Sequence, residues 1–267
     1  MKEIKAVVIG AAGKIGNRII HIINETPSIR LHRAIEKPDH PSIGKDIGEV
    51  IGLGKMGIPL EGDLKKDGGD VIINFTNPKT SIESLEFAKE TGSAIVIGTT
   101  GLSPEQIGKV NELSKSIRCI FTPNMSVGMN VMFRIVQKVA QVLGSEYDIE
   151  IFEAHHRLKK DSPSGTAMKL GELIASSIGR DFSKVGVYGR KGMVGERTKE
   201  EIGMQVIRAG DIVGDHTVLF GGIGERLEII HRAHSRDNFA RGAVRAALWL
   251  VNQPNGLYDM QDVLGLR

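Results

Sequence analysis

The start of the chain constrains its fold more than any other stretch. Residues 4–10 form an apolar run typical of a buried parallel strand, and isoleucines at helical spacing predict a helix from about residue 16 to residue 24. Gly10, Gly13 and Gly16 form a tight loop between these two elements. A strand, a glycine loop and a helix in this order predict the first part of a β-α-β unit, whose crossover is right-handed.

Strands and helices keep alternating as far as residue 121. The predicted strands cover residues 31–35, 70–75, 94–98 and 119–121, and the predicted helices cover residues 78–90 and 104–116. We expect Ser103 to cap the second of these helices, with Pro104 at its first position. Residues 37–63 are interrupted by glycine and proline and predict no clear element. The alternation predicts an α/β fold with a Rossmann-like, doubly wound parallel sheet.

The glycine loop has the context of a dinucleotide-binding turn. Its backbone N–H groups can approach a pyrophosphate at the start of the helix. Glu36 ends the next strand about 20 residues further on, where an acid accepts hydrogen bonds from ribose hydroxyls, and Lys37 can instead pair with a 2′-phosphate. We therefore expect either NADH or NADPH as cofactor. Because Ala12 stands where the commoner spacing has glycine, a ligand-free glycine turn is the alternative.

Two further turns lie at the carboxyl ends of predicted strands. They are Gly98–Gly101 and Thr122–Met125. In an open parallel sheet the ligand crevice lies outside these ends, so both turns are candidate walls of a nicotinamide pocket. Gly, Thr, Pro and Asn are also ordinary turn residues, which leaves plain loop chemistry as the alternative.

The pattern changes after about Asn124. Predicted helices cover residues 128–143, 166–178 and 238–251, and predicted strands cover residues 148–154, 204–208, 216–220 and 225–234. Residues 210–214 suggest a hairpin between two of these strands. We expect residues 1–126 and 236–267 to form a discontinuous dinucleotide-binding domain, because the last helix can return to cover it. Residues 127–235 then form an α+β domain with an open mixed sheet, for substrate binding and oligomerisation.

The stretch Glu153–Thr166 is the strongest candidate for chemistry. It holds two adjacent histidines, His155 and His156, followed by cationic side chains and a Ser-Pro-Ser-Gly-Thr helix start. Histidine exchanges a proton near neutral pH, and the N–H groups of a helix start bind carboxylate or phosphate. The stretch therefore predicts a proton donor beside an anion site. A solvated basic loop is the alternative.

Composition and pattern argue against several other classes of function. A net charge of +3 without a long basic block argues against nucleic acid. No apolar run approaches the ~20 residues that span a membrane, and Met1 leads straight into a strand without a signal peptide, so we expect a cytoplasmic location. Cys119, the single cysteine, is expected to be a buried, inert thiol. A metal site formed by Glu153, His155 and His156 is disfavoured, because adjacent histidines on a strand point to opposite faces.

Residues 153–166 closely resemble the signature of the dihydrodipicolinate reductase family, also called 4-hydroxy-tetrahydrodipicolinate reductases. The likeness covers nearly the whole chain and includes residues 7–16, 98–101, 124–130, 208–216 and 224–228. The resemblance implies NAD(P)H-dependent reduction of 4-hydroxy-tetrahydrodipicolinate, a cyclic dicarboxylate, to tetrahydrodipicolinate with loss of water. This step belongs to diaminopimelate and lysine biosynthesis. The family also implies a homotetramer built by the sheet of the substrate domain.

The resemblance assigns roles residue by residue. His155 is the expected proton donor and Lys159 a second donor, while His156, Gly165 and Thr166 are expected to hold the substrate. The expected cofactor residues are Gly10, Ala11, Ala12, Gly13, Lys14, Ile15, Glu36, Lys37, Gly98, Thr99, Thr100, Thr122, Pro123, Asn124 and Met125. Chemistry supports the substrate roles independently. Hydride arrival on a conjugated imine leaves negative charge that a nearby acid must quench, and two carboxylates need cations and N–H donors.

Some positions depart from the family pattern or lie at its margin. Leu158 replaces a frequent histidine at a peripheral position, Met125 replaces a frequent aromatic residue, and Lys37 replaces a frequent arginine. The last change leaves the choice between NADH and NADPH open. Arg157 and Lys160 are interpreted as solvated. Two rival functions share the first domain, namely another NAD(P)-dependent dehydrogenase and a dinucleotide-sensing regulatory subunit, but neither needs the histidine motif followed by Ser-Gly-Thr.

Overall fold

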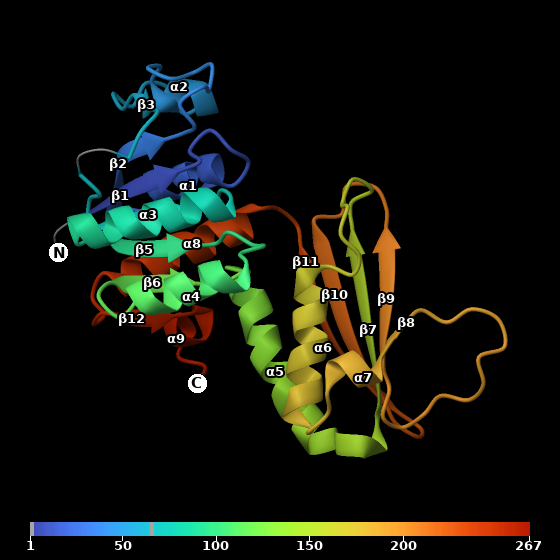
Figure 1. The fold of residues 1–267 in the computed structure, drawn as a ribbon. Coiled ribbons are helices and arrows are strands. Elements are labelled where there is room, and N and C mark those ends of the chain that lie inside the picture. Colours follow the sequence, from blue (N-terminus) through green and yellow to red (C-terminus); the bar gives the residue numbers. More distant parts are fainter. Residues whose placement is uncertain (1–2, 65–66) are drawn as a thin grey trace. The chain divides into compact units, whose positions relative to one another are not determined.

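The computed structural model describes residues 3–64 and 67–267. These residues divide into two compact units (Figure 1). Met1–Val127 together with Arg236–Arg267 form the first unit, and Gly128–Ser235 form the second. In the described part of the chain, no helix is long and apolar enough to cross a membrane.

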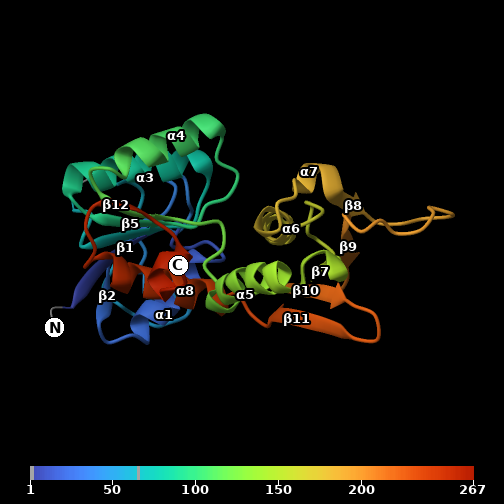
Figure 2. The ribbon, with the colours of Figure 1, turned by 90° about the horizontal axis from the view of Figure 1, so that it is seen from below.

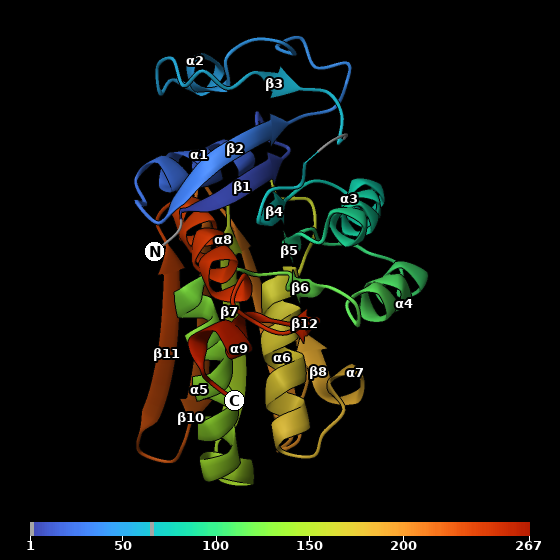
Figure 3. The same cartoon turned by 90° about the vertical axis from the view of Figure 1, so that its left-hand side faces the viewer.

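The first unit is built on a parallel sheet. Across its described residues, seven strands are hydrogen-bonded in the order β12-β6-β5-β4-β1-β2-β3 (Figure 3). Their bounds are β1 (Ile4–Ile9), β2 (Ile29–Ile35), β3 (Leu60–Glu61), β4 (Val71–Asn74), β5 (Ala94–Ile97), β6 (Arg118–Phe121) and β12 (Gly256–Tyr258). Every pairing in this order is parallel. The predicted parallel sheet is confirmed, and the strands predicted from sequence form its centre.

Helices cover both faces of this sheet (Figure 2). One face carries α1 (Gly16–Asn24) and α8 (Asp237–Leu250), and the other carries α3 (Pro78–Thr91) and α4 (Pro104–Leu113). Strand side chains alternate between the two faces. Ala6 and Val8 of β1 join the core that includes α1 and α8, whereas Val7 and Ile9 join the core that includes α3 and α4. The predicted doubly wound architecture is therefore confirmed.

The sequence predicted the start of α4 well. The hydroxyl of Ser103 accepts a hydrogen bond from the N–H of Gln106 at 3.2 Å, and the Gln106 side chain accepts one from the N–H of Ser103 at 2.8 Å. This reciprocal pair is a capping box, which confirms Ser103 as the N-cap. The helix ends at Leu113, three residues earlier than expected.

The elements at the sheet edges escaped prediction. They are the strands β3 and β12 and the short helices α2 (Ile47–Ile51) and α9 (Met260–Leu264). Each is too short to show a periodic apolar pattern. The start of α2 depends instead on Asp46, whose carboxylate accepts N–H groups from Met56, Gly57, Glu49 and Gly48. These hydrogen bonds, that from Met56 foremost, lower the pKa of Asp46.

Cys119 lies in β6 and is fully buried. Burial raises the pKa of its thiol to about 12. A thiol that stays protonated at neutral pH is a poor nucleophile, so Cys119 is a packing residue of the sheet.

The second unit pairs a mixed sheet with helices on one face. Across its described residues the strand order is β11-β10-β7-β9-β8. Its elements are α5 (Val127–Leu143), β7 (Asp148–His155), α6 (Gly165–Ser177), α7 (Phe182–Val185), β8 (Gly186–Tyr188), β9 (Ile202–Arg208), β10 (Gly214–Gly221) and β11 (Arg226–Ala233). Core residues of α5 and α6 pack against β7, β9 and β10. The opposite face carries Phe152, Ile207 and Ile230, which are 37%, 50% and 44% exposed.

The predicted hairpin across residues 210–214 is wrong. β10 pairs antiparallel with β7 and β11, whereas β9 pairs parallel with β7 and β8. β7 therefore lies between the two strands that were expected to form the hairpin. Turn residues indicate that the chain reverses, but they do not determine which strand becomes the neighbour. One face of β7 is buried and the other is partly exposed, and both of its edges are paired, as in a central strand of a sheet that is covered on one side.

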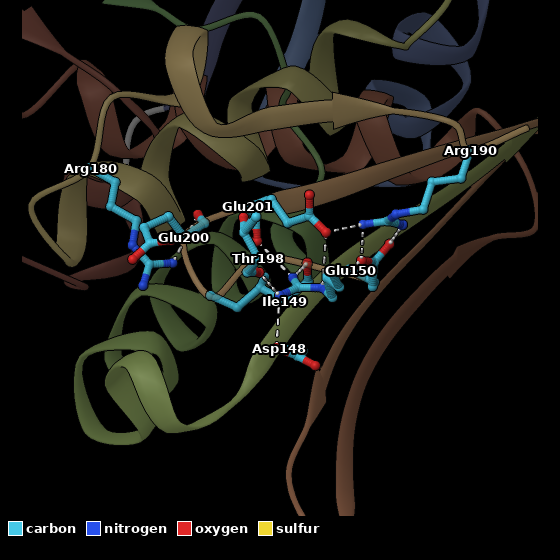
Figure 4. A network of polar contacts seen from close by, with 9 residues as sticks. Asp148, Ile149, Glu150, Arg180, Arg190, Thr198, Glu200 and Glu201 are labelled. Carbon is cyan, nitrogen blue, oxygen red and sulfur yellow. Dashed lines mark hydrogen bonds and ion pairs between the residues drawn. The ribbon is translucent and has the colours of Figure 1, made fainter. Parts of the chain in front are cut away.

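Ion pairs between arginines and carboxylates attach the segment between β8 and β9 to the sheet. Arg190 donates to both carboxylate oxygens of Glu150, at 3.1 and 2.9 Å, and to Glu201 at 3.1 Å (Figure 4). Arg197 donates to Asp148 at 2.7 Å and to Glu150 at 3.2 Å. Burial opposes ionisation of Glu150, but these arginines outweigh it and lower its pKa.

Candidate active site

The residues predicted to bind a dinucleotide follow the carboxyl ends of adjacent strands. The pairing register places the last residues of β1, β2, β4, β5 and β6 in one row, namely Ile9, Ile35, Asn74, Ile97 and Phe121. The loops after these residues therefore begin at one edge of the sheet, where open parallel sheets bind their ligands. These loops include the glycine loop, the Glu36-Lys37 pair and both candidate turns.

The glycine loop brings backbone close to the start of α1. Gly10 has a φ of 77°, in the left-handed region, and its N–H and that of Ala11 donate to the carbonyl of Ile35 at 2.8 and 3.0 Å. A Cβ at Gly13 would come within 3.1 Å of the Gly10 carbonyl oxygen, and one at Gly16 would lie 3.0 Å from Cα of Ala11. α1 begins at Gly16 with no side-chain cap. An uncapped helix start lined by backbone fits a pyrophosphate.

Glu36 is attached to this loop. Its carboxylate accepts the N–H of Ala12 at 3.2 Å and the N–H of Lys37 at 3.0 Å. The acid therefore lies where a dinucleotide on the loop would meet it. The ammonium of Lys37 lies 3.3 Å from a carboxylate oxygen of Asp39, and the Lys37 side chain is 63% exposed. It is accessible to an anion.

The turns after β5 and β6 combine buried and exposed residues. Thr99, Thr122 and Met125 are buried, Gly98 and Asn124 are half-buried, and Thr100 and Pro123 are exposed. Oγ1 of Thr99 accepts hydrogen bonds from the N–H of Thr76 at 3.2 Å and from the hydroxyl of Ser81 at 2.7 Å. Met125 is 1% exposed and belongs to the core beside α8. Thr99 and Met125 thus support the fold whatever they contact in a complex.

Sequence reasoning missed the loop after β4, residues 75–77. A Cβ at Gly98 would lie 2.7 Å from Cδ1 of Phe75, and one at Gly10 would lie 2.8 Å from Cγ2 of Thr76. This loop therefore packs against both the glycine loop and the turn after β5. The rule that selected the other two turns would have selected it, since residues 70–75 were predicted as a strand of the same sheet.

In the second unit, β7 presents Glu153 and His155 on the face that α6 covers. The two residues lie two positions apart, and they are 1% and 9% exposed. Nδ1 of His155 lies 2.6 Å from Oε2 of Glu153. Oε1 of Glu153 accepts the N–H of Ser164 at 2.9 Å, and the guanidinium of Arg208 donates to both oxygens, at 2.8 and 2.9 Å. A buried carboxylate thus holds the histidine, the N-cap of α6 and an arginine of β9.

His216 of β10 lies beside this group. Its ring centroid is 5.3 Å from that of His155, at an interplanar angle of 78°, and its Nε2 lies 3.2 Å from the hydroxyl of Ser164. Burial, with a smaller contribution from His155, lowers the pKa of His216 to about 3. This ring is therefore neutral over the ordinary pH range.

The remaining residues of the motif follow β7. The ammonium of Lys159 lies 2.9 Å from the carboxylate of Asp161, with its side chain 20% exposed. His156 is half-buried, and Nδ1 of its ring is buried without a hydrogen-bond partner. Gly165 and Thr166 are the first residues of α6, which Ser164 caps by accepting the N–H of Ala167.

The flanking residues of the motif point to solvent. Arg157, Leu158 and Lys160 are exposed, Leu158 by 78%. Across residues 3–64 and 67–267, no group of three His, Cys, Asp or Glu side chains is placed to hold a metal ion.

The partners of the motif were not found from sequence. Ser164 lies in the predicted helix start, but its hydrogen bond to Glu153 had no signal, and neither had the ion pair of Asp161 with Lys159. Arg208 and His216 come from other strands. Only the pairing of β7 with β9 and β10 brings them to Glu153 and His155.

Family models and relatives match this chain over its length. The model described as dihydrodipicolinate reductase, N-terminus, matches residues 4–125, and the model described as dihydrodipicolinate reductase, C-terminus, matches residues 128–264. A 4-hydroxy-tetrahydrodipicolinate reductase of Syntrophus aciditrophicus (strain SB) is 55% identical over 266 residues, covering 99% of each chain. One of Geotalea uraniireducens (strain Rf4) is 54% identical, covering 99% of this chain and 100% of the relative.

A solved structure shares the fold. It is a dipicolinate-bound dihydrodipicolinate reductase from Paenisporosarcina sp. TG-14, with a TM-score of 0.72 and 24% identity, covering 97% of this chain and 98% of the other. With the two family models and the close relatives, the assignment is plain: this chain belongs to the dihydrodipicolinate reductase family.

Proposed function

We propose that this protein is a 4-hydroxy-tetrahydrodipicolinate reductase that uses NADH or NADPH and acts in diaminopimelate and lysine biosynthesis. Membership of the family and the names of its close relatives support the activity. The observation that carries the proposal is the buried group around His155. A histidine at the end of β7 shares the carboxylate of Glu153 with the N-cap of α6, so a proton donor and an anion-binding helix start are joined by two hydrogen bonds.

The proposed reaction divides between the two units. In the first, the glycine loop would hold the pyrophosphate, Glu36 the ribose hydroxyls and Lys37 a 2′-phosphate, with residues 98–100 and 122–125 around the nicotinamide. The cofactor, when bound, supplies the hydride. In the second unit, His156 and the start of α6 at Gly165 and Thr166 would bind the substrate carboxylates.

Two proton donors complete the proposed chemistry. His155 would quench the negative charge that hydride arrival leaves on the heterocycle. Lys159, held at 2.9 Å by Asp161, would supply a second proton. The departing hydroxyl needs a proton to leave as water, and the neighbouring ring carbon gives up a proton in the same elimination. With the hydride, only the proton from His155 is therefore added net.

The test is to follow NADH and NADPH oxidation by absorbance, with the substrate formed in situ from pyruvate and aspartate semialdehyde. We expect turnover in the wild type and a loss of about 10²–10⁴-fold in His155→Gln. Dinucleotide binding, measured separately by fluorescence, should be unchanged in the variant. Tight dinucleotide binding without turnover by the wild type would overturn the proposal and favour a dinucleotide sensor or another dehydrogenase.

A tetramer is part of the same proposal. The open face of the second sheet carries Phe152, Ile207 and Ile230, all more than a third exposed. Apolar side chains on a strand face of this kind are typical of an interface between subunits. Light scattering of the wild type tests this, and a monomeric mass at working concentration would contradict it.

A further inference from the structure

The hydrogen bonds around Glu153 decide which nitrogen of His155 carries the proton. Burial opposes the charged form of Glu153, but hydrogen bonds from His155, Arg208 and the N–H of Ser164 outweigh it and lower its pKa to about 2. An ionised carboxylate has no proton to give, so Nδ1 of His155, 2.6 Å away, must be the donor. Neutral His155 is therefore the Nδ1–H tautomer, with its lone pair on Nε2.

Nε2 of His155 lies beside Gly214, where the Cβ of any larger residue would crowd it. A Cβ at Gly214, the first residue of β10, would lie 3.0 Å from this nitrogen. Among the described residues, no group of the chain hydrogen-bonds Nε2. One ring nitrogen is thus held by the protein, and beside the other a glycine takes up the least space.

We propose that Glu153 is a positioning residue, which holds His155 so that Nε2 is the atom that delivers the proton. The proposal rests on the function proposed above, because it assigns His155 the role of acid. Glu153 also accepts the N–H of Ser164, the N-cap of α6. One carboxylate therefore fixes both the proton donor and the helix start at which the substrate carboxylates would bind.

The groups around His155 make Glu153 the anion that stabilises its protonated form. On β10, His216 faces the ring edge-on and is neutral, because burial lowers its pKa to about 3. On β9, the positive charge of Arg208 is turned to Glu153, and from α6 Ser164 contributes an N–H. Lys159, after β7, acts electrostatically on His216. Loss of the Glu153 charge should therefore destabilise the protonated form of His155.

The variant that tests this is Glu153→Gln. A glutamine keeps the size of the side chain and can still accept the N–H of Ser164, but its amide can also donate to Nδ1 and so permit the other tautomer. We expect kcat to fall about 10²–10⁴-fold with KM for the heterocycle changed less than about threefold. The alkaline side of the pH–rate profile should move to lower pH, because the anion beside the imidazolium is gone.

Glu150→Gln is the matched control. Glu150 lies on the same strand and is likewise paired with arginine, here Arg190 and Arg197, but it lies on the opposite face from His155. We expect this change to affect stability without moving the pH profile or kcat by more than about twofold. A purely structural role for Glu153 would give the two variants similar profiles.

A second readout needs no turnover and does not depend on the folding of Glu153→Gln. Long-range ¹H–¹⁵N correlation spectra at about pH 9, where ordinary histidines are neutral, report the tautomer of each ring. We expect Nδ1–H for His155 in the wild type, assigned by its absence in His155→Gln. A wild-type Nε2–H tautomer, or a Glu153→Gln pH profile like that of Glu150→Gln, would overturn the proposal. Lack of reductase turnover with the Nδ1–H tautomer present would instead refute the proposed function alone.

Discussion

Two candidate carboxylates, Glu153 and Glu36, differ in the hydrogen bonds that the protein gives them. Glu153 is 1% exposed and is bonded by His155, Ser164 and Arg208, so its charge is compensated within the fold. Glu36 is half-buried, and among residues 3–64 and 67–267 it accepts the N–H groups of Ala12 and Lys37 alone. A carboxylate with this arrangement can exchange a weak backbone contact for a ribose hydroxyl. We infer that the first carboxylate is fixed and that the second can respond to a ligand.

Lys37 allows a prediction about cofactor preference. Its ammonium is 63% exposed and lies 3.3 Å from Asp39, which makes it a screened point charge. Lys37→Ala should therefore raise KM for NADPH about fivefold, which corresponds to about 1 kcal/mol, and leave KM for NADH nearly unchanged. Lys79→Ala, with a side chain 86% exposed on α3, serves as the control. Equal effects of Lys37→Ala on both cofactors would contradict a 2′-phosphate contact.

Single residues were predictable from sequence where the chemistry is local. The motif at residues 153–166 predicted the start of α6, which the structure confirms, and it made His155 a candidate, because a helix-start signal and a histidine pair lie close together in the sequence. Its partner Arg208 was not predictable. That residue reaches Glu153 only because β9 pairs with β7 in parallel, with His155 opposite Arg208 in the register.

At the scale of elements, apolar runs and helical periodicity predicted the central strands and the long helices, but not strand order. β9 and β10 are separate runs with a glycine turn between them, and a local rule joins them as a hairpin. The fold places β7 between them instead. β3 and β12 were missed because strands of two and three residues carry no pattern.

The space around each glycine predicts opposite outcomes for two substitutions, one where the glycine loop meets α1 and one in α4. A Cβ at Gly16 would clash with the backbone of Gly10 and Ala11. Backbone cannot move away as easily as the end of a flexible side chain. Gly16→Ala should therefore lower the free energy of unfolding by about 2–3 kcal/mol. Gly108 lies in α4 with open space where a Cβ would be, so Gly108→Ala should raise it by about 0.5–1 kcal/mol.

Urea titration followed by tryptophan fluorescence measures both changes. The single tryptophan, Trp249, lies in α8 and packs edge-on against Tyr258 in the first unit, so it reports unfolding there. Equal stability of Gly16→Ala and the wild type would mean that the loop can shift away from α1. The close backbone approach would then not be required for folding.

At the scale of the whole molecule, the buried residues of each hydrophobic core come from one unit. The cores on either face of the parallel sheet draw their buried residues from the first unit, and the core of α5, α6 and the mixed sheet draws its buried residues from the second. Each core carries its own set of buried polar groups. Conditions that act on one set should therefore destabilise one unit before the other.

Acid should act first on the second unit. Burial lowers the pKa of His216 from 6.5 to about 3, so between these values the unfolded chain binds a proton that the folded chain does not. Its contribution to stability is full above pH 6.5 and is lost as pH falls toward 3. Glu153, with its pKa lowered from 4.5 to about 2, adds a second loss that begins only below pH 4.5.

Urea unfolding at about pH 7.5, 6, 5 and 4 tests this order, with Trp249 fluorescence for the first unit and far-UV circular dichroism for both. We expect the dichroism midpoint to fall with pH while the fluorescence midpoint stays nearly constant. His216→Gln should weaken the dependence above pH 4.5, because a glutamine at this position has no proton to gain, and should leave the loss caused by Glu153 below it. Burial also lowers the pKa of His231, which accounts for a smaller remaining dependence. A dichroism midpoint independent of pH in the wild type would show that burial of His216 does not limit stability. A fluorescence midpoint that falls in step would show that the units unfold together, with the acid sensitivity of the second transmitted to the first.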